Sequence, residues 1–160
     1  MSGQVHWIVA KHALRYLRGT VGYELRYTSS EGVKLVGFTD SDWAGSVVDK
    51  KSTSGCCFSL GSTMVSWFRK KQTSVALSTT EAKYIVACAA CKKAVWLLKL
   101  LADLSGHELD VTVIFCDNQS CVNLSENSVF HDRSNHIDMK YHYIRDSSEG
   151  SCEAPAYLHG

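Results

Sequence analysis

Residues 35–40, Leu-Val-Gly-Phe-Thr-Asp, decide the fold prediction because an apolar run ends there on a carboxylate. A second apolar run, Val111 to Cys116, is followed in the same way by Asp117. Both runs are apolar on both faces, which predicts buried strands whose carboxyl ends lie over a dry part of a sheet. If the two strands are neighbours in one sheet, the side chains of Asp40 and Asp117 meet at its edge.

A third acidic residue, Glu81, lies in the first turn of a long predicted helix. Hard cations such as Mg²⁺ take oxygen ligands and keep several waters, so two or three carboxylates from different elements suffice for a site. Three close carboxylates also repel one another unless a cation lies between them. We therefore predict that Asp40, Glu81 and Asp117 are catalytic residues and metal ligands of a metal-dependent nuclease.

Each acid also has a purely structural interpretation. The run Ser78-Thr79-Thr80-Glu81 fits a capping box, in which the glutamate reaches back to the first amides of the helix. Asp117 fits the N-cap of a following helix, and Asp40 fits a turn former. Asp42 has the same side-chain parity as Asp40, so it either joins the cluster or is a solvated turn residue.

Composition predicts one ordered domain. The chain has 160 residues, 45% of them hydrophobic, with one proline and four tryptophans, which argues against disorder. The formal net charge is only +1, so contacts to nucleic acid must come from local basic patches. The candidate nucleic-acid-binding residues are Lys50, Lys51, Arg69, Lys70 and Lys71, with a solvated charge run as the alternative.

The chain has no apolar run long enough to cross a bilayer and no signal-peptide pattern at its start. We therefore expect a cytoplasmic protein without a membrane partner. The seven cysteines are odd in number and fall mostly within apolar runs, so they are predicted to be reduced and to act as small hydrophobic residues.

Periodicity predicts an α/β fold. Residues 5 to 18 read as an amphipathic helix that Gly19 ends, and Gly22 to Tyr27 and Leu35 to Asp40 read as strands. Ser54 to Leu60 and Thr63 to Arg69 flank Gly61-Ser62, a two-residue connection that suits a type II′ hairpin turn. The strand at residues 35–40 and this hairpin give three consecutive antiparallel strands.

The second half of the chain is predicted to add helices and a fourth strand. A helix begins at Ser78 and ends at Gly106, with one apolar face formed by Ala82, Ile85, Val86, Ala89, Trp96, Leu97, Leu100, Leu101 and Leu104. The strand Val111 to Cys116 follows a crossover and should pair in parallel, ahead of a helix from Asn118 to about Glu126. A further helix is predicted over 138–145, and residues 147–160 are expected to be loosely structured.

Other possible sites are weaker. Cys116, Cys121, His131 and His136 have a spacing that is short for a Cys₂His₂ zinc site. Cys88 and Cys91 lie in a helix among alanines, where packing explains them better than redox chemistry. His136 is a possible accessory residue that orients a phosphate or moves a proton, and a structural histidine is its alternative. Trp43 and Trp67 either stack on bases or are buried.

Several motifs together resemble one known family. They are Gly37-Phe38-Thr39-Asp40-Ser41-Asp42-Trp43-Ala44-Gly45, Lys51-Ser52-Thr53-Ser54-Gly55, Ala76-Leu77-Ser78-Thr79-Thr80-Glu81-Ala82-Lys83-Tyr84, Cys116-Asp117-Asn118-Gln119-Ser120 and the stretch 130–145. In this order they resemble the ribonuclease H domain of copia-type LTR retrotransposon Pol polyproteins. The segment from His6-Trp7 to Thr20 resembles the end of the preceding reverse-transcriptase region.

The resemblance implies a ribonuclease H-like mixed sheet and hydrolysis of the RNA strand of an RNA–DNA hybrid. It assigns Asp40, Glu81 and Asp117 as ligands of two Mg²⁺ ions, with Mn²⁺ as a substitute. It also implies residues 1–30 as the tail of a reverse-transcriptase region and 31–160 as the ribonuclease H-like domain. The reverse-transcriptase domain of the same polyprotein is the expected partner, and the nucleus or virus-like particles become alternative locations.

The chain departs from the family pattern at several positions. Family members usually continue to a helix with an Ala-Asp pair that supplies a fourth carboxylate, which the ending at 153–159 does not resemble. The domain is therefore predicted to be incomplete at its C-terminus, with Asp138 or Asp42 as a conceivable substitute ligand. Lys83 and Asn135, which stand where the family often has Glu and Lys, are expected on exposed faces. A catalytically inactive remnant that only binds nucleic acid or acts as a scaffold is the alternative function.

Overall fold

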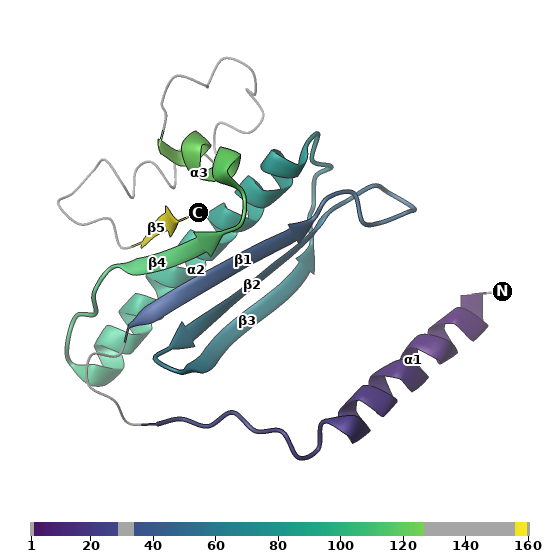
Figure 1. Cartoon of the computed structure of the whole chain (residues 1–160), viewed down its shortest axis with the longest axis horizontal. Helices are drawn as coiled ribbons and strands as arrows, with labels where there is room; N and C mark the ends of the chain where they lie inside the picture. Colours follow the sequence, from purple (N-terminus) through teal and green to yellow (C-terminus); the bar gives the residue numbers. More distant parts are fainter. Residues whose placement is uncertain (1, 29–33, 127–155, 160) are drawn as a thin grey trace.

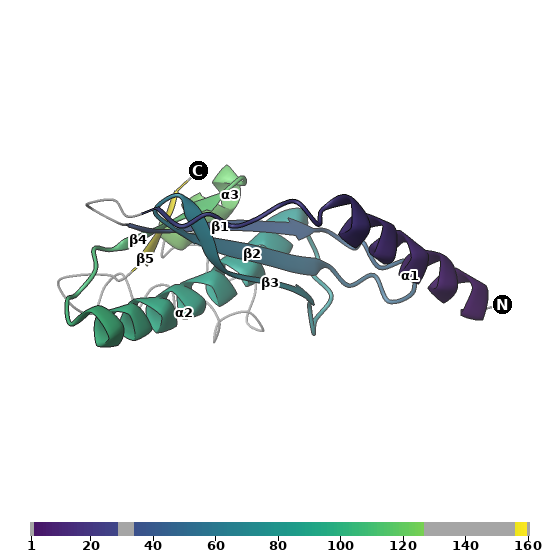
Figure 2. The same ribbon diagram turned by 90° about the horizontal axis from the view of Figure 1, so that it is seen from below.

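The computed structural model describes residues 2–28, 34–126 and 156–159 of the chain. A sheet in the order β3-β2-β1-β4-β5 forms its centre, and a long helix, α2, lies along one face of it (Figures 1 and 2). The strands are β1 Leu35–Asp42, β2 Thr53–Leu60, β3 Thr63–Lys71, β4 Thr112–Cys116 and β5 Ala156–His159. The helices are α1 Ser2–Gly19, α2 Thr79–Ser105 and α3 Gln119–Glu126.

The strand pairing confirms the predicted mixed sheet. β1 pairs antiparallel with β2, β2 pairs antiparallel with β3, and β1 pairs parallel with β4 on its other side. The β2–β3 connection is the predicted two-residue turn, since Leu60 pairs with Thr63. Gly61 has a φ of 60°, the positive value that the first position of a type II′ turn requires. Thus β1 lies in the middle of the sheet, between β2 and β4.

Helix α2 begins and ends at the predicted residues. Ser78 is the N-cap, and its hydroxyl accepts a 3.1 Å hydrogen bond from the Glu81 amide. At the other end Gly106 adopts a left-handed conformation with a φ of 72°, and its amide donates to the Ala102 carbonyl over 2.9 Å. These two caps set the ends of the helix.

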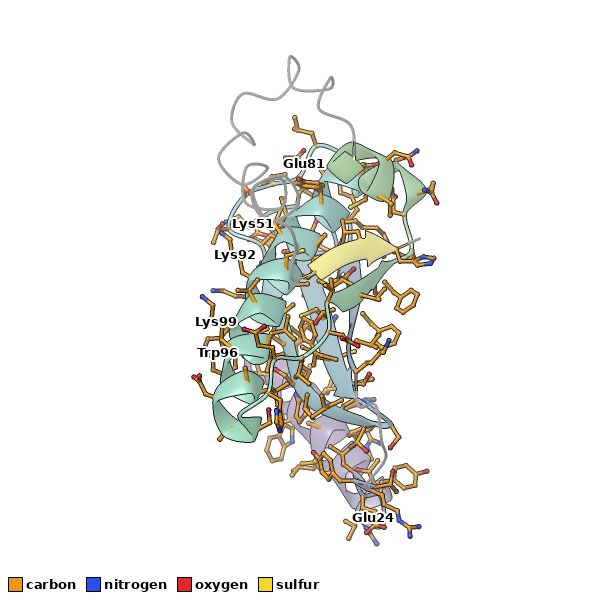
Figure 3. All side chains as sticks on the ribbon, turned by 90° about the vertical axis from the view of Figure 1, so that its left-hand side faces the viewer. Glu24, Lys51, Glu81, Lys92, Trp96 and Lys99 are labelled. Carbon is orange, nitrogen blue, oxygen red and sulfur yellow. The ribbon has the colours of Figure 1, made fainter. Side chains whose placement is uncertain are left out.

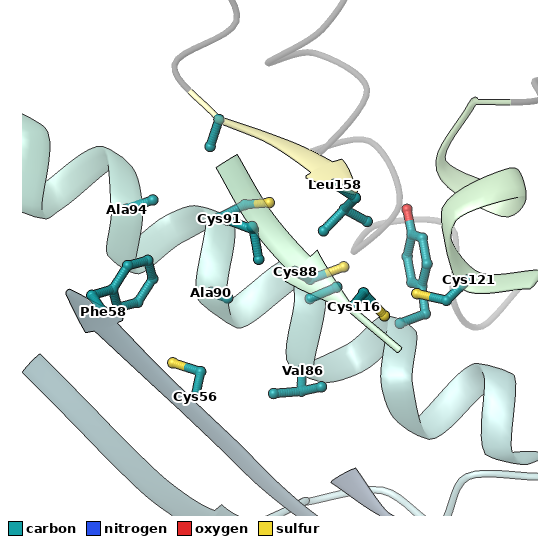
Figure 4. Close-up of a cluster of buried hydrophobic side chains, with 14 of the residues drawn as sticks. Cys56, Phe58, Val86, Cys88, Ala90, Cys91, Ala94, Cys116, Cys121 and Leu158 are labelled. Carbon is teal, nitrogen blue, oxygen red and sulfur yellow. The ribbon is translucent and has the colours of Figure 1, made fainter. Parts of the chain in front are cut away.

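The buried face of α2 differs from the predicted one. Small residues cover the face that packs on the sheet, where Ala87, Ala90 and Ala94 are completely buried. Figure 4 shows Ala90 and Ala94 on this face. Of the predicted face, Trp96 and Leu104 are 52% and 76% exposed. The large side chains dominated the sequence pattern, but alanines and cysteines let the helix approach the sheet more closely than leucines would. The prediction of this face was therefore wrong at Trp96, Leu100 and Leu104, whereas Leu97 is buried and Leu101 packs against the core as predicted.

The core lies between α2 and one face of the sheet. Phe58 of β2 and Ile114 of β4 are fully buried there, and both lie next to the place that a side chain on Gly37 of β1 would occupy. The six cysteines within the described residues are not joined in disulfide bonds. Burial raises the pKa values of the Cys56 and Cys91 thiols to about 12. Such thiols are unreactive and pack as small hydrophobic residues, in agreement with their predicted role.

Two predictions about the ends of the chain were wrong. Residues 22–27 form no strand; the segment instead passes the β2–β3 hairpin, where the Tyr27 hydroxyl donates to the Met64 carbonyl over 3.3 Å. Residues 156–159, expected to be loose, form β5 and pair in parallel with β4. A four-residue strand has too short a pattern to identify it, and its partner strand determines its conformation. The predicted helix over 138–145 lies outside the described residues.

The two faces of β1 differ sharply. Leu35, Gly37, Thr39 and Ser41 are buried. Phe38, Asp40 and Asp42, which alternate with them along the strand, are exposed. We call the side of the sheet that carries this second set the open face, because α2 covers the other side (Figure 2). Helix α1 extends away from the sheet with exposed residues along its length (Figures 1 and 2). The proposed boundary at residue 30 remains a prediction.

Candidate functional site

Parallel pairing of β1 with β4 places Asp40 beside Asp117. Thr39 and Cys116 are register partners, so the next residue on each strand is the aspartate. The Thr39 hydroxyl also donates a 3.0 Å hydrogen bond to the Phe115 carbonyl and ties the two strand ends together. Asp40 lies on the exposed side of β1 and Asp117 directly follows β4, so both aspartates lie at the same edge of the sheet. Two of the three predicted acids are therefore brought together.

The two aspartates are more exposed to solvent than the sequence predicted. The side chains of Asp40 and Asp117 are 82% and 64% exposed. Next to them on the open face, the rings of Phe38 and Phe115 stack with centroids 5.5 Å apart and remain 40% and 39% exposed. The prediction that these strands are buried on both faces was therefore wrong, because α2 covers only one of them.

Lys83 joins the two aspartates. Its ammonium group lies 3.5 Å from Asp40 Oδ1 and makes a direct hydrogen bond and ion pair with Asp117 Oδ1. The Lys83 side chain is only 15% exposed, so the expectation of an exposed residue at this position was wrong. Burial works to lower the pKa of Lys83, but the hydrogen bond and charge of Asp117, followed by those of Asp40, raise it above 10.5. Lys83 is therefore a firmly charged partner of both carboxylates.

Glu81 is engaged differently from the aspartates. It is 9% exposed, and its Oε2 accepts a 2.7 Å hydrogen bond from the Leu77 amide just before the helix. With the Ser78 hydroxyl bound to the Glu81 amide, this arrangement resembles the capping box expected from the sequence. Within the described part of the chain, no group of three His, Cys, Asp or Glu residues lies close enough to hold a metal ion. Glu81 is thus not drawn into a cluster with Asp40 and Asp117.

The chemistry of the two aspartates nevertheless suits a hard divalent cation. Mg²⁺ is commonly held by one or two carboxylates together with waters and substrate phosphates, so a donor pair that faces solvent is sufficient. Asp40 and Asp117 offer such oxygens at one edge of the sheet. The positive charge of Lys83 already neutralises part of the pair, and a cation would share these carboxylates with it.

Asp42 holds the loop that follows β1. Its Oδ1 accepts a hydrogen bond from the Thr53 amide, and a Cβ atom on Gly45 would lie 2.5 Å from its Oδ2. The loop is also fixed at Trp43, whose indole nitrogen donates to the Ala76 carbonyl over 3.1 Å although the side chain is 50% exposed. These contacts anchor the loop to β2 and to the start of α2.

A cleft of about 440 Å³ lies on the open face beside Asp40. The strand registers place Asp40, Gly55 and Arg69 opposite one another on β1, β2 and β3. Because Gly55 has no side chain, the cleft separates a carboxylate on one side from a guanidinium on the other. Asp42 and Thr53 line its end. The cleft therefore presents opposite charges across a gap in the sheet surface.

The predicted basic residues divide into two groups. Arg69 lines the cleft, and Lys70 beside it is exposed. Lys71 forms a 2.9 Å ion pair with Asp49 of the loop after β1, and hydrogen bonds from Ser46 and Lys71 lower the pKa of Asp49. Lys50 and Lys51 belong to the same loop, with Lys50 exposed. Their contact with nucleic acid remains a prediction. His131, His136 and Asp138 lie outside the described residues.

Comparison with known proteins identifies the chain's relatives. It is 44% identical to the retrovirus-related Pol polyprotein from transposon TNT 1-94 of Nicotiana tabacum, over 144 residues that make up 90% of the chain. The chain is homologous to a segment of copia-type retrotransposon Pol polyproteins. That similarity spans 11% of the tobacco polyprotein's own length, so the chain corresponds to a small part of its Pol relatives. No family model matches the chain.

Solved structures confirm the fold predicted for this Pol homologue. Ribonuclease H1 from Halobacterium salinarum superposes with a TM-score of 0.53 at 14% identity, covering 79% of the chain and 83% of that protein. LC11-RNase H1, solved in complex with an RNA/DNA hybrid, gives the same TM-score at 10% identity with the same coverage. The fold is that of ribonuclease H. Among its described residues, no helix is both long and apolar enough to cross a membrane.

Proposed function

We propose that this Pol homologue hydrolyses the RNA strand of an RNA–DNA hybrid as the ribonuclease H module of a retrotransposon polyprotein. One observation carries the proposal: the register of β1 and β4 sets Asp40 and Asp117 side by side at the strand ends, on a ribonuclease H fold. Paired carboxylates at such an edge suit metal-assisted phosphoryl chemistry. The reverse-transcriptase domain of the same polyprotein is the proposed partner.

The proposed roles follow from the positions of the side chains. Asp40 and Asp117 hold divalent cations, Mg²⁺ by preference and Mn²⁺ as a substitute, through carboxylate oxygens that face solvent. Asp40 and Asp117 would hold two such cations, whose chemistry when bound is to activate a water for in-line attack and to stabilise charge on the departing 3′ oxygen. Glu81 lies apart from the aspartate pair in this structure; it is the proposed third ligand through its carboxylate oxygen other than Oε2, with the side chain turned toward the strand ends.

The cleft beside Asp40 is the proposed path of the hybrid. Arg69 on its far wall is placed to contact a backbone phosphate while the neighbouring phosphate lies at Asp40. Lys70 is exposed at the same end of β3, but the alternation of side chains along the strand turns it to the opposite face from Arg69, away from this cleft. RNA would be distinguished from DNA through its 2′-hydroxyl groups in the wide minor groove of the hybrid. LC11-RNase H1, whose fold is similar, was solved with such a hybrid.

A second candidate function is hybrid binding without hydrolysis. The ion pairs of Lys83 with Asp40 and Asp117 favour it, because a positive charge already occupies the region between the two carboxylates. In this alternative the fold and the basic residues recognise nucleic acid while the acids have only a structural role. The two functions differ in whether the RNA strand is cut.

The test is cleavage of a hybrid whose RNA strand is labelled at its 5′ end. We expect Mg²⁺-dependent products with 3′-hydroxyl ends, and loss of cleavage in Asp117→Asn. The matched control is Asp103→Asn, the same change at an exposed position in the last turn of α2, at the opposite end of that helix from Lys83. Equal cleavage by the original chain and Asp117→Asn would refute the hydrolase proposal. Binding of the hybrid by both proteins without any cleavage would favour the second candidate.

A further inference from the structure

Lys83 is placed by the helix that carries it. It belongs to the second turn of α2 and lies three and four residues before Val86 and Ala87, which are completely buried. Residues at this spacing share one face of a helix, so Lys83 extends the face that packs on the sheet. Its aliphatic stem is covered, with 15% of the side chain exposed, while its ammonium group reaches the strand ends.

The two carboxylates that Lys83 meets differ from it in exposure. Asp40 and Asp117 are mostly open to solvent, at 82% and 64%, and each uses its Oδ1 for the lysine. The position of the ammonium group is therefore fixed by the protein around the lysine stem, whereas the two carboxylates are accessible to ions in solution. A divalent cation bound to the same pair would lie close to a fixed positive charge and lose free energy by repulsion.

We infer that Lys83 is a built-in counter-ion of the Asp40–Asp117 pair, and that it competes with divalent cations for these two carboxylates. The inference rests on the proposed function for the identity of the metal ligands, but it concerns the affinity for the cation and not the cleavage of the hybrid. It predicts that the chain binds Mg²⁺ and Mn²⁺ weakly, and that removal of the Lys83 charge strengthens the binding.

The experiment is a titration with Mn²⁺ alone, in the absence of nucleic acid, followed by the electron paramagnetic resonance signal of the free ion. Lys83→Met removes the charge and keeps an unbranched apolar stem, while Lys83→Arg keeps the charge. Lys99→Met is the matched control because Lys99 is exposed and lies farther along the same helix from Glu81 (Figure 3). Low ionic strength is used because salt screens interactions between exposed charges.

We expect Lys83→Met to bind Mn²⁺ about tenfold more tightly or better, because a like charge close to the ion is removed. Lys83→Arg and Lys99→Met should bind as weakly as the original chain. Adding Asp117→Asn to Lys83→Met should abolish the gain, which locates the ion at the pair. Equal affinity of Lys83→Met and Lys99→Met would overturn the inference, and so would a gain that survives Asp117→Asn. Circular dichroism melting curves verify that each variant is folded.

The results distinguish failure of the counter-ion role from failure of the proposed hydrolase function. If Lys83→Met gains Mn²⁺ affinity but neither protein cuts a hybrid, the counter-ion role stands and the hydrolase proposal fails. If the original chain cuts a hybrid and Lys83→Met binds Mn²⁺ no better than Lys99→Met does, the hydrolase proposal stands and the counter-ion role fails.

Discussion

Gly37 offers a quantitative test of how β1 is held in the sheet. A Cβ atom at this position would lie 2.8 Å from Phe58 Cε1 and 3.1 Å from Ile114 Cγ1. Phe58 and Ile114 are both fully buried, so neither side chain can move into solvent. Extra atoms in a packed core cost about 1–3 kcal/mol, from which the gain of about 0.4–1 kcal/mol for replacing a glycine is subtracted. We expect Gly37→Ala to destabilise the fold by about 1–2 kcal/mol.

Urea denaturation followed by circular dichroism measures this change. With a slope of about 1.5 kcal/mol per molar urea, the midpoint of unfolding should fall by roughly 1 M. Gly55→Ala is the matched control, since its Cβ atom would meet only the Asp40 carbonyl at 3.7 Å and the Phe68 carbonyl at 4.0 Å, both ordinary contacts. Its midpoint should be unchanged or slightly higher. A Gly37→Ala midpoint equal to or above that of Gly55→Ala would refute the packing argument.

The remaining predictions concern Glu81 and Lys83. Glu81→Gln keeps an oxygen that can accept a hydrogen bond from the Leu77 amide, so the melting temperature should fall less than in Ser78→Ala, which loses an N-cap worth about 1 kcal/mol. A stability loss as large as that of Ser78→Ala would contradict the cap geometry. Hybrid cleavage by Glu81→Gln should still fall if Glu81 is a metal ligand. The pKa of Lys83 is raised by folding, so its stabilisation is complete below pH 10.5 and is lost as pH rises through the folded value. The difference in melting temperature between the original chain and Lys83→Met should therefore stay constant from pH 8 to about pH 10.5 and shrink only at higher pH, and a difference that already shrinks below pH 10 would count against a charged partner role.

Local sequence patterns were sufficient for much of the framework. Ser78 and Gly106 mark both ends of α2, and Gly61-Ser62 marks the hairpin, because caps and tight turns depend on residues close together in the chain. The parallel pairing of β4 with β1 followed from the crossover helix. This parallel pairing is what brings Asp40 and Asp117 together at the strand ends.

The errors concern features that depend on distant partners. The role of Lys83 depends on the rotation of α2 about its axis, which the alanines at 87, 90 and 94 determine and the larger leucines obscured. A lysine three and four residues before Val86 and Ala87 was the signal that could have revealed it. Likewise, β1 and β4 have apolar residues on both faces, and only the structure shows that, within the described residues, no helix covers the open face.

The alternation along β1 separates two kinds of constraint on this chain. Leu35, Gly37 and Thr39 face α2 and determine whether the domain folds, whereas Asp40 and its outward neighbours face water and determine what the surface can bind. Substitutions of the second kind alter chemistry at little thermodynamic cost. The packing of the domain and the chemistry of its exposed strand ends can therefore change independently, because a substitution on the outward side of β1 leaves the contacts with α2 in place.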